Sequence, residues 1–331
     1  MIKDFLSLLA CPKCRGGLNT EIIEQNRQEV VRAKLTCTAC NTKYSMEDGI
    51  PDLYYAPRKT LQEGVRKLFN ETPYGIVGAR DAMEHPEKIS IHTLNTTPWY
   101  VAESDVRGKY ALEAGCGGGH LYTELELLGA NVIGIDQTPN SLYHIRKLFI
   151  EHGRVPNLVI GNLEYLPFKD NTFDMITSMG VIHHTPNPQA CLDHFARALK
   201  TTGKIHIMVY HKTSVWNYTK KILRYLCRRS RIFSRLIFAL TPLWSGETKT
   251  QSNTVTVFRD NMVNPITKSF NARELRDMAE KAGLVLQKVD RRELPELYVM
   301  GKRVYQSRLL RWYEKRFGWF LLASMSKKSL W

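Results

Sequence analysis

The sequence contains no long uninterrupted hydrophobic segment. No apolar run in its 331 residues approaches the ~18 residues that a membrane-spanning helix requires, so a helical integral membrane protein is excluded. The run Leu8-Leu9-Ala10-Cys11 ends like a bacterial lipoprotein signal. Its apolar stretch is nevertheless shorter than the roughly 7–15 residues of a signal core, and Asp4 lies where such a signal is basic. We therefore expect a cytoplasmic protein with reduced thiols.

Cysteine is scarce, yet four of the seven cysteines form two close pairs. Cys11 and Cys14 make one C-x2-C turn, Cys37 and Cys40 make another, and 22 residues separate the pairs. Two such turns supply four sulfur ligands for tetrahedral zinc. A four-cysteine site has no open position for a substrate, so we expect structural rather than catalytic zinc. The alternative, a disulfide framework, is disfavoured because nothing else in the sequence indicates export.

Acidic side chains are depleted from the last two fifths of the chain. Residues 200–331 contain 27 Lys and Arg against 9 Asp and Glu, whereas residues 1–199 contain 20 against 23. The net charge of +15 is therefore concentrated at one end of the sequence. Such asymmetry indicates a polyanionic partner, which can be nucleic acid, an anionic membrane surface or a phosphorylated substrate.

A short apolar strand leads into a glycine turn at residues 112–119, and a second strand at 131–136 ends in Asp136. Glycines let a backbone approach a ligand closely, and a carboxylate at this position can accept hydrogen bonds from ribose hydroxyls. A dinucleotide fingerprint would need a small residue at position 120. The sequence has His120 there, which disfavours a dinucleotide.

The resulting pattern, acidic-x-Gly-x-Gly-x-Gly, resembles the first motif of class I S-adenosylmethionine (SAM) methyltransferases of the type 11 group. The resemblance implies a doubly wound, Rossmann-like α/β fold with a seven-stranded sheet. It also implies roles for single residues. Glu113 would lie near the amino group of the methionine part and Asp136 at the ribose, while Asn162 stands where the family usually has Asp beside the adenine. The implied cofactor-binding residues are Glu113, Gly115, Gly117, Gly119, Asp136, Asn162, Leu163 and Met179.

The segment around the cysteines, residues 8–53, resembles a zinc-ribbon family whose stand-alone members are small activating partners of RNA and protein methyltransferases. We therefore predict three parts. Residues 1–54 form the zinc ribbon, 55–106 a helical connector over the cofactor cleft, and 107–331 the methyltransferase domain. Within the connector, residues 69–75 look like a cofactor lid, with a plain linker as the alternative.

Strand and helix patterns alternate from residue 107 to residue 210, as a doubly wound parallel sheet requires. Beyond them the sequence predicts a basic insertion at about 211–268, a capped helix and a sixth strand, then a basic helix and an antiparallel edge strand. The predicted strands are 110–113, 132–136, 158–161, 173–178, 205–210, 284–289 and 319–325, and the predicted helices are 61–69, 120–128, 141–152, 191–199, 271–283 and 302–316.

The first half of the insertion, residues 216–240, is basic and rich in aromatic residues. It contains seven Lys and Arg residues and no acidic residue: Lys220, Lys221, Arg224, Arg228, Arg229, Arg231 and Arg235. This composition is typical of a membrane-surface element, a phosphate-binding cap or a nucleic-acid groove, and an ordinary helical lid is the alternative. Trp216, Phe233 and Phe238 are the aromatic residues that we expect to enter a membrane interface.

The chemistry of methyl transfer limits what the protein must supply. The sulfonium is already an activated donor, so the enzyme mainly positions the acceptor in line, and a base is needed only if the acceptor loses a proton. A His-containing loop after the fourth strand resembles that of the small-molecule and lipid-quinone branch of the family. The predicted catalytic residues are His184, His183 and Tyr210, with His211 and Asp260 as further candidates.

The sequence therefore predicts a cytoplasmic SAM-dependent methyltransferase that can lie at the membrane surface, with a small-molecule or lipid-linked, anionic acceptor. The alternative is an RNA methyltransferase acting on ribosomal or transfer RNA. Against it, His183 and His184 stand where an amino-methylating Asn-Pro-Pro-Tyr motif would be expected. A non-catalytic SAM-binding assembly factor is a third reading, disfavoured because the cofactor motifs are retained.

Overall fold

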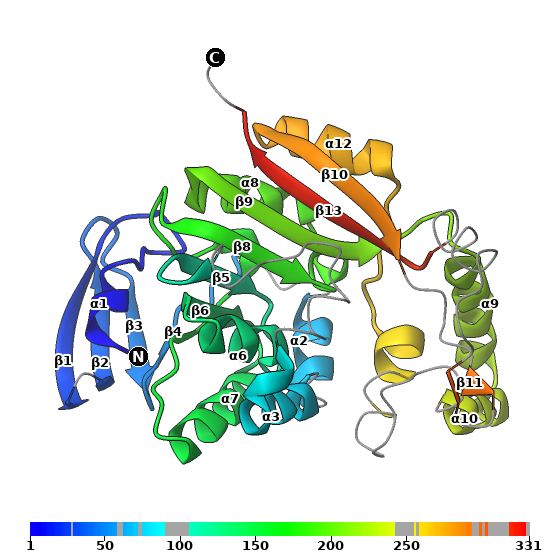
Figure 1. The fold of residues 1–331 in the computed structure, drawn as a ribbon, viewed down its shortest axis with the longest axis horizontal. Helices are drawn as coiled ribbons and strands as arrows, with labels where there is room; N and C mark the ends of the chain where they lie inside the picture. The colour runs from blue at the N-terminus through cyan, green and yellow to red at the C-terminus, as the bar shows by residue number, and fades with distance from the viewer. Residues whose placement is uncertain are drawn as a thin grey trace.

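A large mixed β-sheet runs through the protein. The computed structural model describes residues 1–27, 29–57, 62–71, 75–89, 106–241, 255, 258–292, 298–299, 302–303 and 318–328. Within these ranges eleven strands form one sheet in the order β1-β2-β3-β4-β7-β6-β5-β8-β9-β13-β10 (Figure 1). Helices cover both faces of the sheet, which confirms the α/β fold class.

Five parallel strands form the centre of this sheet. The chain runs outward from β5 to β7 and then crosses to β8 on the other side of β5. The carboxyl ends of β5 and β8 therefore flank the topological switch point, where folds of this class bind ligands. The elements are β5 (Tyr110–Ala114), α6 (His120–Leu127), β6 (Asn131–Asp136), α7 (Pro139–Glu151), β7 (Leu158–Ile160), η3 (Leu163–Tyr165), β8 (Phe173–Met179), η4 (Ile182–His184), α8 (Pro188–Ala198) and β9 (Leu199–Tyr210).

Apolar side chains of the central strands alternate between two hydrophobic cores. Leu112 and Ile133 lie in the core formed with α8 and α12 (Ala272–Lys281), whereas Ala111 and Val132 lie in the core formed with α6 and α7. Successive residues of a strand point to opposite faces, so a strand covered on both sides needs apolar residues on both. All four side chains are at most 2% exposed. The two cores fix the sheet between its helical layers.

The N-terminal domain is an antiparallel β-ribbon that follows a short helix, α1 (Lys3–Leu6). Each of its strands pairs antiparallel with the next, and the cysteine pairs lie at the turns beside them. The predicted ribbon is confirmed. Its strands are β1 (Leu18–Asn26), β2 (Glu29–Cys37), β3 (Lys43–Glu47) and β4 (Ile50–Asp52).

The last ribbon strand continues the sheet of the following domain. Asp52 of β4 pairs in parallel with Ile160 of β7, and the backbone nitrogen of Leu53 donates a hydrogen bond to the carbonyl oxygen of Ile160 at 2.9 Å. Without β4, the edge of β7 would present unpaired backbone groups. The seven expected strands are present as β5 to β10 and β13. The four ribbon strands extend this sheet at β7, so one eleven-stranded sheet results.

The C-terminal part adds two antiparallel strands. Helix α12 begins with a capping box in which Asn271 and Glu274 bond each other's backbone nitrogens at 2.9 Å. Strand β13 (Phe320–Lys327) then pairs with both β9 and β10 (Leu284–Arg292). The prediction of an edge strand at 319–325 is wrong about the edge, because β13 inserts between β9 and β10 and leaves β10 outermost.

The prediction of a basic helix over residues 302–316 is wrong for its first two residues. Lys302–Arg303 forms strand β12, which pairs antiparallel with β11 (Tyr298–Val299). Backbone pairing with β11 replaces the helical turn at these two residues. The remainder of the predicted helix lies outside the described residues.

Two groups of helices lie at the carboxyl end of the sheet. The connector contributes α2 (Gln62–Glu71), α3 (Ile76–Glu84) and η1 (Pro86–Lys88), and α3 packs on α6 and α7. The insertion contributes α9 (Val215–Arg229), α10 (Arg231–Leu240) and η6 (Arg259–Val263), which form a lobe at the right of Figure 1. Among the helices described, none combines the length and the apolar character that crossing a bilayer would demand.

Candidate functional site

The glycine loop after β5 has a backbone conformation and a close packing that leave no room for side chains. Gly115, Gly117 and Gly119 have φ angles of 83°, 49° and 85°. A Cβ on Gly115 would lie 2.4 Å from Cγ1 of Val181, and one on Gly119 would lie 2.7 Å from Cγ1 of Ile145. Contacts this short cannot be accommodated, so the loop needs glycine both for its conformation and for its close packing.

Asp136, at the end of β6, holds this loop. Its Oδ2 accepts a hydrogen bond from the backbone nitrogen of Gly117 at 2.9 Å, and its Oδ1 accepts from the nitrogen and hydroxyl of Thr138 at 2.9 and 2.6 Å. Burial raises the pKa of Asp136, and the bonds from Thr138 and Gly117 oppose that shift. Each carboxylate oxygen has two lone pairs, so Asp136 can accept further bonds from a diol.

A second carboxyl group, Glu113, is buried below the loop. Glu113 is 5% exposed, and its Oε2 has no hydrogen-bond partner among the described residues. Burial, and then the nearby charge of Glu124, raises the pKa of Glu113 well above its usual value. An unsatisfied buried carboxyl oxygen can bind a cationic group of a ligand. An ammonium group would donate a hydrogen bond to this oxygen, and its positive charge would stabilise the carboxylate form.

The sequence reasoning missed a histidine–carboxylate contact next to this carboxyl. His120 Nε2 lies 2.9 Å from Oε1 of Glu124, which is 3% exposed. The two residues are four positions apart on α6, and this spacing is the signal that could have found the contact. Glu124 is thus a second buried acidic side chain near Glu113, and its charge helps to raise the pKa of Glu113.

The residues predicted beside the adenine are differently engaged. Asn162 is 3% exposed, its Nδ2 donates to the carbonyl oxygen of Tyr55 at 3.2 Å and its Oδ1 accepts from the nitrogen of Glu164 at 3.0 Å. Its amide thus holds the end of the ribbon domain and caps η3. Leu163 is buried in the hydrophobic core, and Met179 lies half-buried at the end of β8.

Helix α2 lies across the segment that follows Asp136. Gln62 Nε2 donates to Oε1 of Gln137 at 2.7 Å, and Arg66 Nε donates to the carbonyl oxygen of Gln137 at 2.7 Å. Further along, a Cβ on Gly75 would lie 3.8 Å from the nitrogen of Gly118. The connector therefore contacts both the glycine loop and the end of β6. Residues 72–74 of the predicted lid lie outside the described residues.

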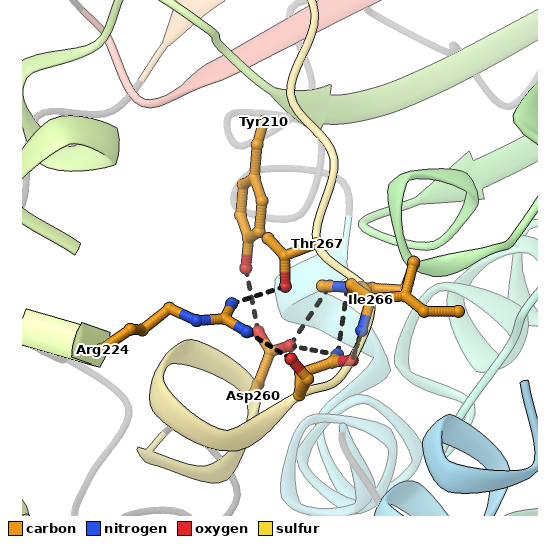
Figure 2. A network of polar contacts seen from close by, with 7 residues as sticks. Tyr210, Arg224, Asp260, Ile266 and Thr267 are labelled. Carbon is orange, nitrogen blue, oxygen red and sulfur yellow. Dashed lines mark hydrogen bonds and ion pairs between the residues drawn. The ribbon is translucent and has the colours of Figure 1, made fainter. Parts of the chain in front are cut away.

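A polar cluster lies beyond the ends of β8 and β9 (Figure 2). Tyr210 Oη donates to Oδ2 of Asp260 at 2.9 Å, and His184 Nε2 lies 3.2 Å from Oδ1 of Asp260. The other nitrogen of His184, Nδ1, lies 2.8 Å from the carbonyl oxygen of Ile266 and 3.0 Å from Nδ2 of Asn264. Protein atoms therefore engage both ring nitrogens of His184.

The charge of Asp260 is stabilised by its neighbours. Burial alone would raise the pKa of Asp260, but His184 and Lys220, together with hydrogen bonds from Asn264 and Tyr210, hold it below the usual value. Burial lowers the pKa of His184, against the attraction of Asp260. Asp260 is thus an ionised acceptor at neutral pH, and it organises the cluster.

The side chain of His183 differs from that of His184 in having no polar partner among the described residues. Its side chain is fully buried, and neither ring nitrogen has a hydrogen-bond partner among the described residues. Its ring centroid lies 4.0 Å from that of Tyr210 and 4.1 Å from that of His184. Burial lowers the pKa of His183 well below its usual value, so the ring is neutral. Three of the predicted catalytic residues, His183, His184 and Tyr210, therefore lie together with Asp260.

His211 does not belong to this cluster. Its Nδ1 lies 2.9 Å from the carbonyl oxygen of Gly318 and its Nε2 lies 2.9 Å from Oγ1 of Thr213, which are structural contacts at the end of β9. The sequence analysis did not single out Lys220, which it counted among the basic residues expected to face a polyanion. Lys220 is 1% exposed and points into the cluster, because α9 turns this side of the insertion toward Tyr210.

The four cysteines of the ribbon converge as the spacing predicts. All four Sγ atoms lie within 4.8 Å of one another, and the Cys11–Cys40 and Cys14–Cys37 sulfur pairs lie 3.7 and 3.4 Å apart. Four ligands about 2.3 Å from a tetrahedral zinc would lie roughly 3.8 Å apart, so the cluster fits that ion. Tyr44 Oη, 3.1 Å from Sγ of Cys11, can donate to a thiolate as an outer-shell partner.

Comparison with known proteins matches both parts of the chain. Residues 112–207 match the methyltransferase domain family, and residues 3–49 match the Trm112p-like protein family. The chain therefore carries a segment similar to the Trm112p-like family ahead of one similar to the methyltransferase domain family. The glycine loop, Asp136 and strands β6 to β8 lie within the second matched segment, which begins at Leu112 inside β5.

Several curated proteins are similar to part of this chain. A ubiquinone biosynthesis O-methyltransferase of Xanthomonas oryzae pv. oryzae is 31% identical over 131 residues, which cover 39% of this chain and 54% of that protein. The protein of the same name from Coxiella burnetii is 32% identical over 118 residues, covering 35% and 50%. The chain therefore spans about half the length of these relatives.

One solved structure similar to this chain is the complex between the Haloferax volcanii Trm112 methyltransferase activator and a methyltransferase. It is 19% identical, covers 80% of this chain and 98% of that one, and has a TM-score of 0.47. The magnesium protoporphyrin IX methyltransferase of Synechocystis with bound SAM is 13% identical, covers 83% and 100%, and has the same TM-score of 0.47.

Proposed function

We propose that this protein is an enzyme that transfers the methyl group of SAM to a small-molecule or lipid-linked acceptor. One observation carries the proposal: a glycine loop and a carboxylate, Asp136, lie at the switch point of a domain that matches the methyltransferase family. The similarity to proteins named ubiquinone biosynthesis O-methyltransferase supports a small or lipid-linked acceptor.

The cofactor would be held at the carboxyl ends of β5, β6 and β7. Asp136 would accept hydrogen bonds from the ribose hydroxyls, and the unsatisfied Oε2 of Glu113 would accept from the ammonium group. Gly115, Gly117 and Gly119 would form the loop beside the methionine part. When bound, SAM supplies the activated methyl group, and the further candidates for the adenine side are Asn162, Leu163 and Met179.

The acceptor would lie at the polar cluster beyond β8 and β9. His183, His184 and Tyr210 are the proposed catalytic residues, and their proximity to one another and to Asp260 supports this assignment. Because both nitrogens of His184 contact protein atoms, His183 is the ring with hydrogen-bonding capacity to offer an acceptor. Tyr210 and His184, which both contact Asp260, would then fix the orientation of the side chains on that side of the acceptor site.

The four cysteines would hold one structural zinc ion. Cys11, Cys14, Cys37 and Cys40 complete a tetrahedral set, which leaves no position for a substrate. Gly16 packs against this cluster, since a Cβ on it would lie 3.0 Å from Sγ of Cys37 and 3.4 Å from Sγ of Cys14. The metal would therefore stabilise the Trm112p-like domain and take no part in methyl transfer.

The outer face of the insertion would bind an anionic membrane surface. Helices α9 and α10 expose Ile222, Ile232 and Leu236 by 62%, 82% and 52% of their surfaces. Exposed basic side chains lie on the same helices: Lys221, Arg228, Arg229, Arg231 and Arg235. A helix with both features lies naturally in the interface of an anionic bilayer.

The aromatic residues of this face differ from those predicted. Phe233 and Phe238 pack against the small core of the insertion, whereas Tyr218 and Tyr225 are exposed by 56% and 58%. The side chain of Trp216 lies outside the described residues. Packing of α10 on α9 explains the difference, because it turns the two Phe side chains inward.

RNA is the second candidate acceptor, favoured by the same basic side chains. A transfer assay with tritiated SAM on separated RNA, lipid and small-metabolite fractions of a host tests the proposal directly. Label in the lipid or metabolite fraction supports it. Label in RNA favours the second candidate, and failure of the purified protein to bind SAM contradicts both.

A further inference from the structure

A lysine side chain is enclosed by aromatic rings at the carboxyl end of the sheet. Lys220 of α9 is 1% exposed, and its Nζ has no hydrogen-bond partner among the described residues. The Nζ lies 3.9 Å from the ring centroid of Tyr210 and 5.6 Å from that of Trp319. Buried lysines are normally paired, because an isolated ammonium group loses its hydration. Among the described residues, this nitrogen instead contacts the ring faces of Tyr210 and Trp319.

The cluster around Lys220 has more cationic than anionic side chains. Arg224, one turn further along α9, bonds two neutral oxygens, Oγ1 of Thr267 at 2.8 Å and the carbonyl oxygen of Asn264 (Figure 2). Asp260 is the carboxylate of the cluster, and its ion pair in the described part of the chain is with a histidine. Neither Lys220 nor Arg224 is paired with a carboxylate within those residues.

The ring nitrogens of His183, which have no hydrogen-bond partner among the described residues, lie in the same place. The His183 ring is tilted by 41° to that of Tyr210 at 4.0 Å between centroids, and after burial the neighbouring His184 and Lys220 lower the pKa of His183 further. Burial lowers the pKa of Lys220 itself to about 7, with Asp260 opposing and Arg224 reinforcing that shift. The groups facing Lys220 are thus Arg224 on its own helix, and His183, His184, Tyr210, Trp319 and Asp260 on the elements around it.

We propose that Lys220 binds an anionic oxygen of the methyl acceptor, with Tyr210 and His183 forming the wall beside it. The inference rests on the proposed methyltransferase function and names the chemistry of its acceptor. An anionic oxygen would receive a charge-assisted hydrogen bond from Nζ and would offset the excess positive charge. The site lies beyond β8 and β9, at the edge of the sheet where ligands of this fold class bind.

Two kinds of acceptor supply such an oxygen. A carboxylate would anchor the acceptor while another atom receives the methyl group. An ionised hydroxyl would itself be the receiving atom. In either case Lys220, rather than the exposed basic residues of α9, selects an acceptor by its charge.

Probe binding to the full-length protein tests the inference without turnover. Two probes are titrated at pH values around 7, with and without saturating S-adenosylhomocysteine: 4-nitrophenol, whose absorbance reports ionisation, and benzoate, which offers a carboxylate. The variant is Lys220→Met, of similar length and without charge. The control is Lys147→Met, because the Lys147 side chain is 76% exposed on α7 and has no part in the polar cluster or the basic face of the insertion.

The wild type and Lys147→Met should bind at least one ionised probe, and 4-nitrophenol should ionise at lower pH when bound. Lys220→Met should weaken that binding by roughly 10–100-fold and leave S-adenosylhomocysteine binding unchanged. Preference for ionised 4-nitrophenol identifies a hydroxyl acceptor, and preference for benzoate identifies a carboxylate anchor. Lys220→Gln serves as a second variant if Lys220→Met fails to fold.

Equal probe affinity in wild type and Lys220→Met would overturn the inference and make Lys220 a packed neutral amine. Failure of the wild type to bind either probe would overturn it as well. The proposed function has a separate readout in the same experiment. If S-adenosylhomocysteine does not bind but the probes bind through Lys220, the methyltransferase proposal fails and the anion site stands.

Discussion

Asp136 Oδ2 accepts a hydrogen bond from the backbone nitrogen of Gly117 at 2.9 Å, which joins the end of one strand to the middle of the glycine loop. The loop after β5 and the carboxylate after β6 therefore form one unit. Thr138 holds the other carboxylate oxygen, so Asp136 has a fixed orientation before any ligand arrives. Preorganised acceptors of this kind bind a diol without a further ordering cost.

Asp136→Ala should weaken SAM binding by roughly 100-fold or more, because it removes two charge-assisted hydrogen bonds worth about 1.5–3 kcal/mol each. Gly117→Val should have a comparable effect, since Gly117 has a φ of 49° that a β-branched residue rarely adopts. Calorimetric titration with SAM measures both. Asp277→Ala, at an exposed position of α12, is the control. Near-normal affinity in both test variants would refute the assignment.

Glu113→Gln should bind SAM more weakly yet make the protein more stable. The folded state raises the pKa of Glu113 well above 4.5, so above that pH the folded chain retains a proton that the unfolded chain releases. The free energy of unfolding of the wild type therefore falls as the pH rises. That of the glutamine variant should fall less between about pH 5 and pH 8. Urea unfolding at several pH values measures this. Parallel pH curves for the two proteins would contradict it.

Removal of one cysteine should unfold the N-terminal ribbon domain locally. Elemental analysis of the purified protein should give close to one zinc per chain, because four thiolates complete its coordination. Cys37→Ser should lose the metal and expose residues 1–53 to proteolysis, since metal binding and folding are coupled in such sites. Cys227→Ser, in the insertion, is the control. A metal-free wild type, or a Cys37→Ser protein that stays resistant, would contradict the prediction.

Leu53→Ala should destabilise the whole sheet. Leu53 is fully buried where β4 meets β7, and its truncation should lower the free energy of unfolding by about 2–5 kcal/mol. Leu226→Ala, at a position 38% exposed on α9, should change it by less than about 0.5 kcal/mol. Denaturant unfolding compares them. A small effect of Leu53→Ala would mean that the two domains are not mechanically joined.

The double variant Ile232→Ser with Leu236→Ser should reduce binding to anionic liposomes, because both side chains are exposed beside arginines on α10. Vesicle sedimentation at two salt concentrations measures this, and added salt should weaken wild-type binding. Ile23→Ser, which alters an exposed apolar residue of the ribbon, is the control. Stronger binding to RNA than to vesicles at equal phosphate concentration would favour the alternative acceptor.

Local sequence patterns determined the parts of this protein whose residues are close along the chain. The spacing of Cys11 and Cys14, and of Cys37 and Cys40, predicts a cluster that the structure contains. The glycine run and Asp136 predict the loop and its carboxylate, since a strand, a turn and a helix in this order have few ways to fold. The parallel strands could be predicted from their short apolar segments.

Tertiary structure decided the features that depend on distant partners. The pairing of Asp52 with Ile160, and the position of β13 inside the sheet, depend on which edges remain unpaired after the central strands have assembled. The burial of Lys220 likewise follows from how α9 packs against Tyr210. In the sequence it is one basic residue among seven, because charge composition cannot tell which side of a helix faces the protein.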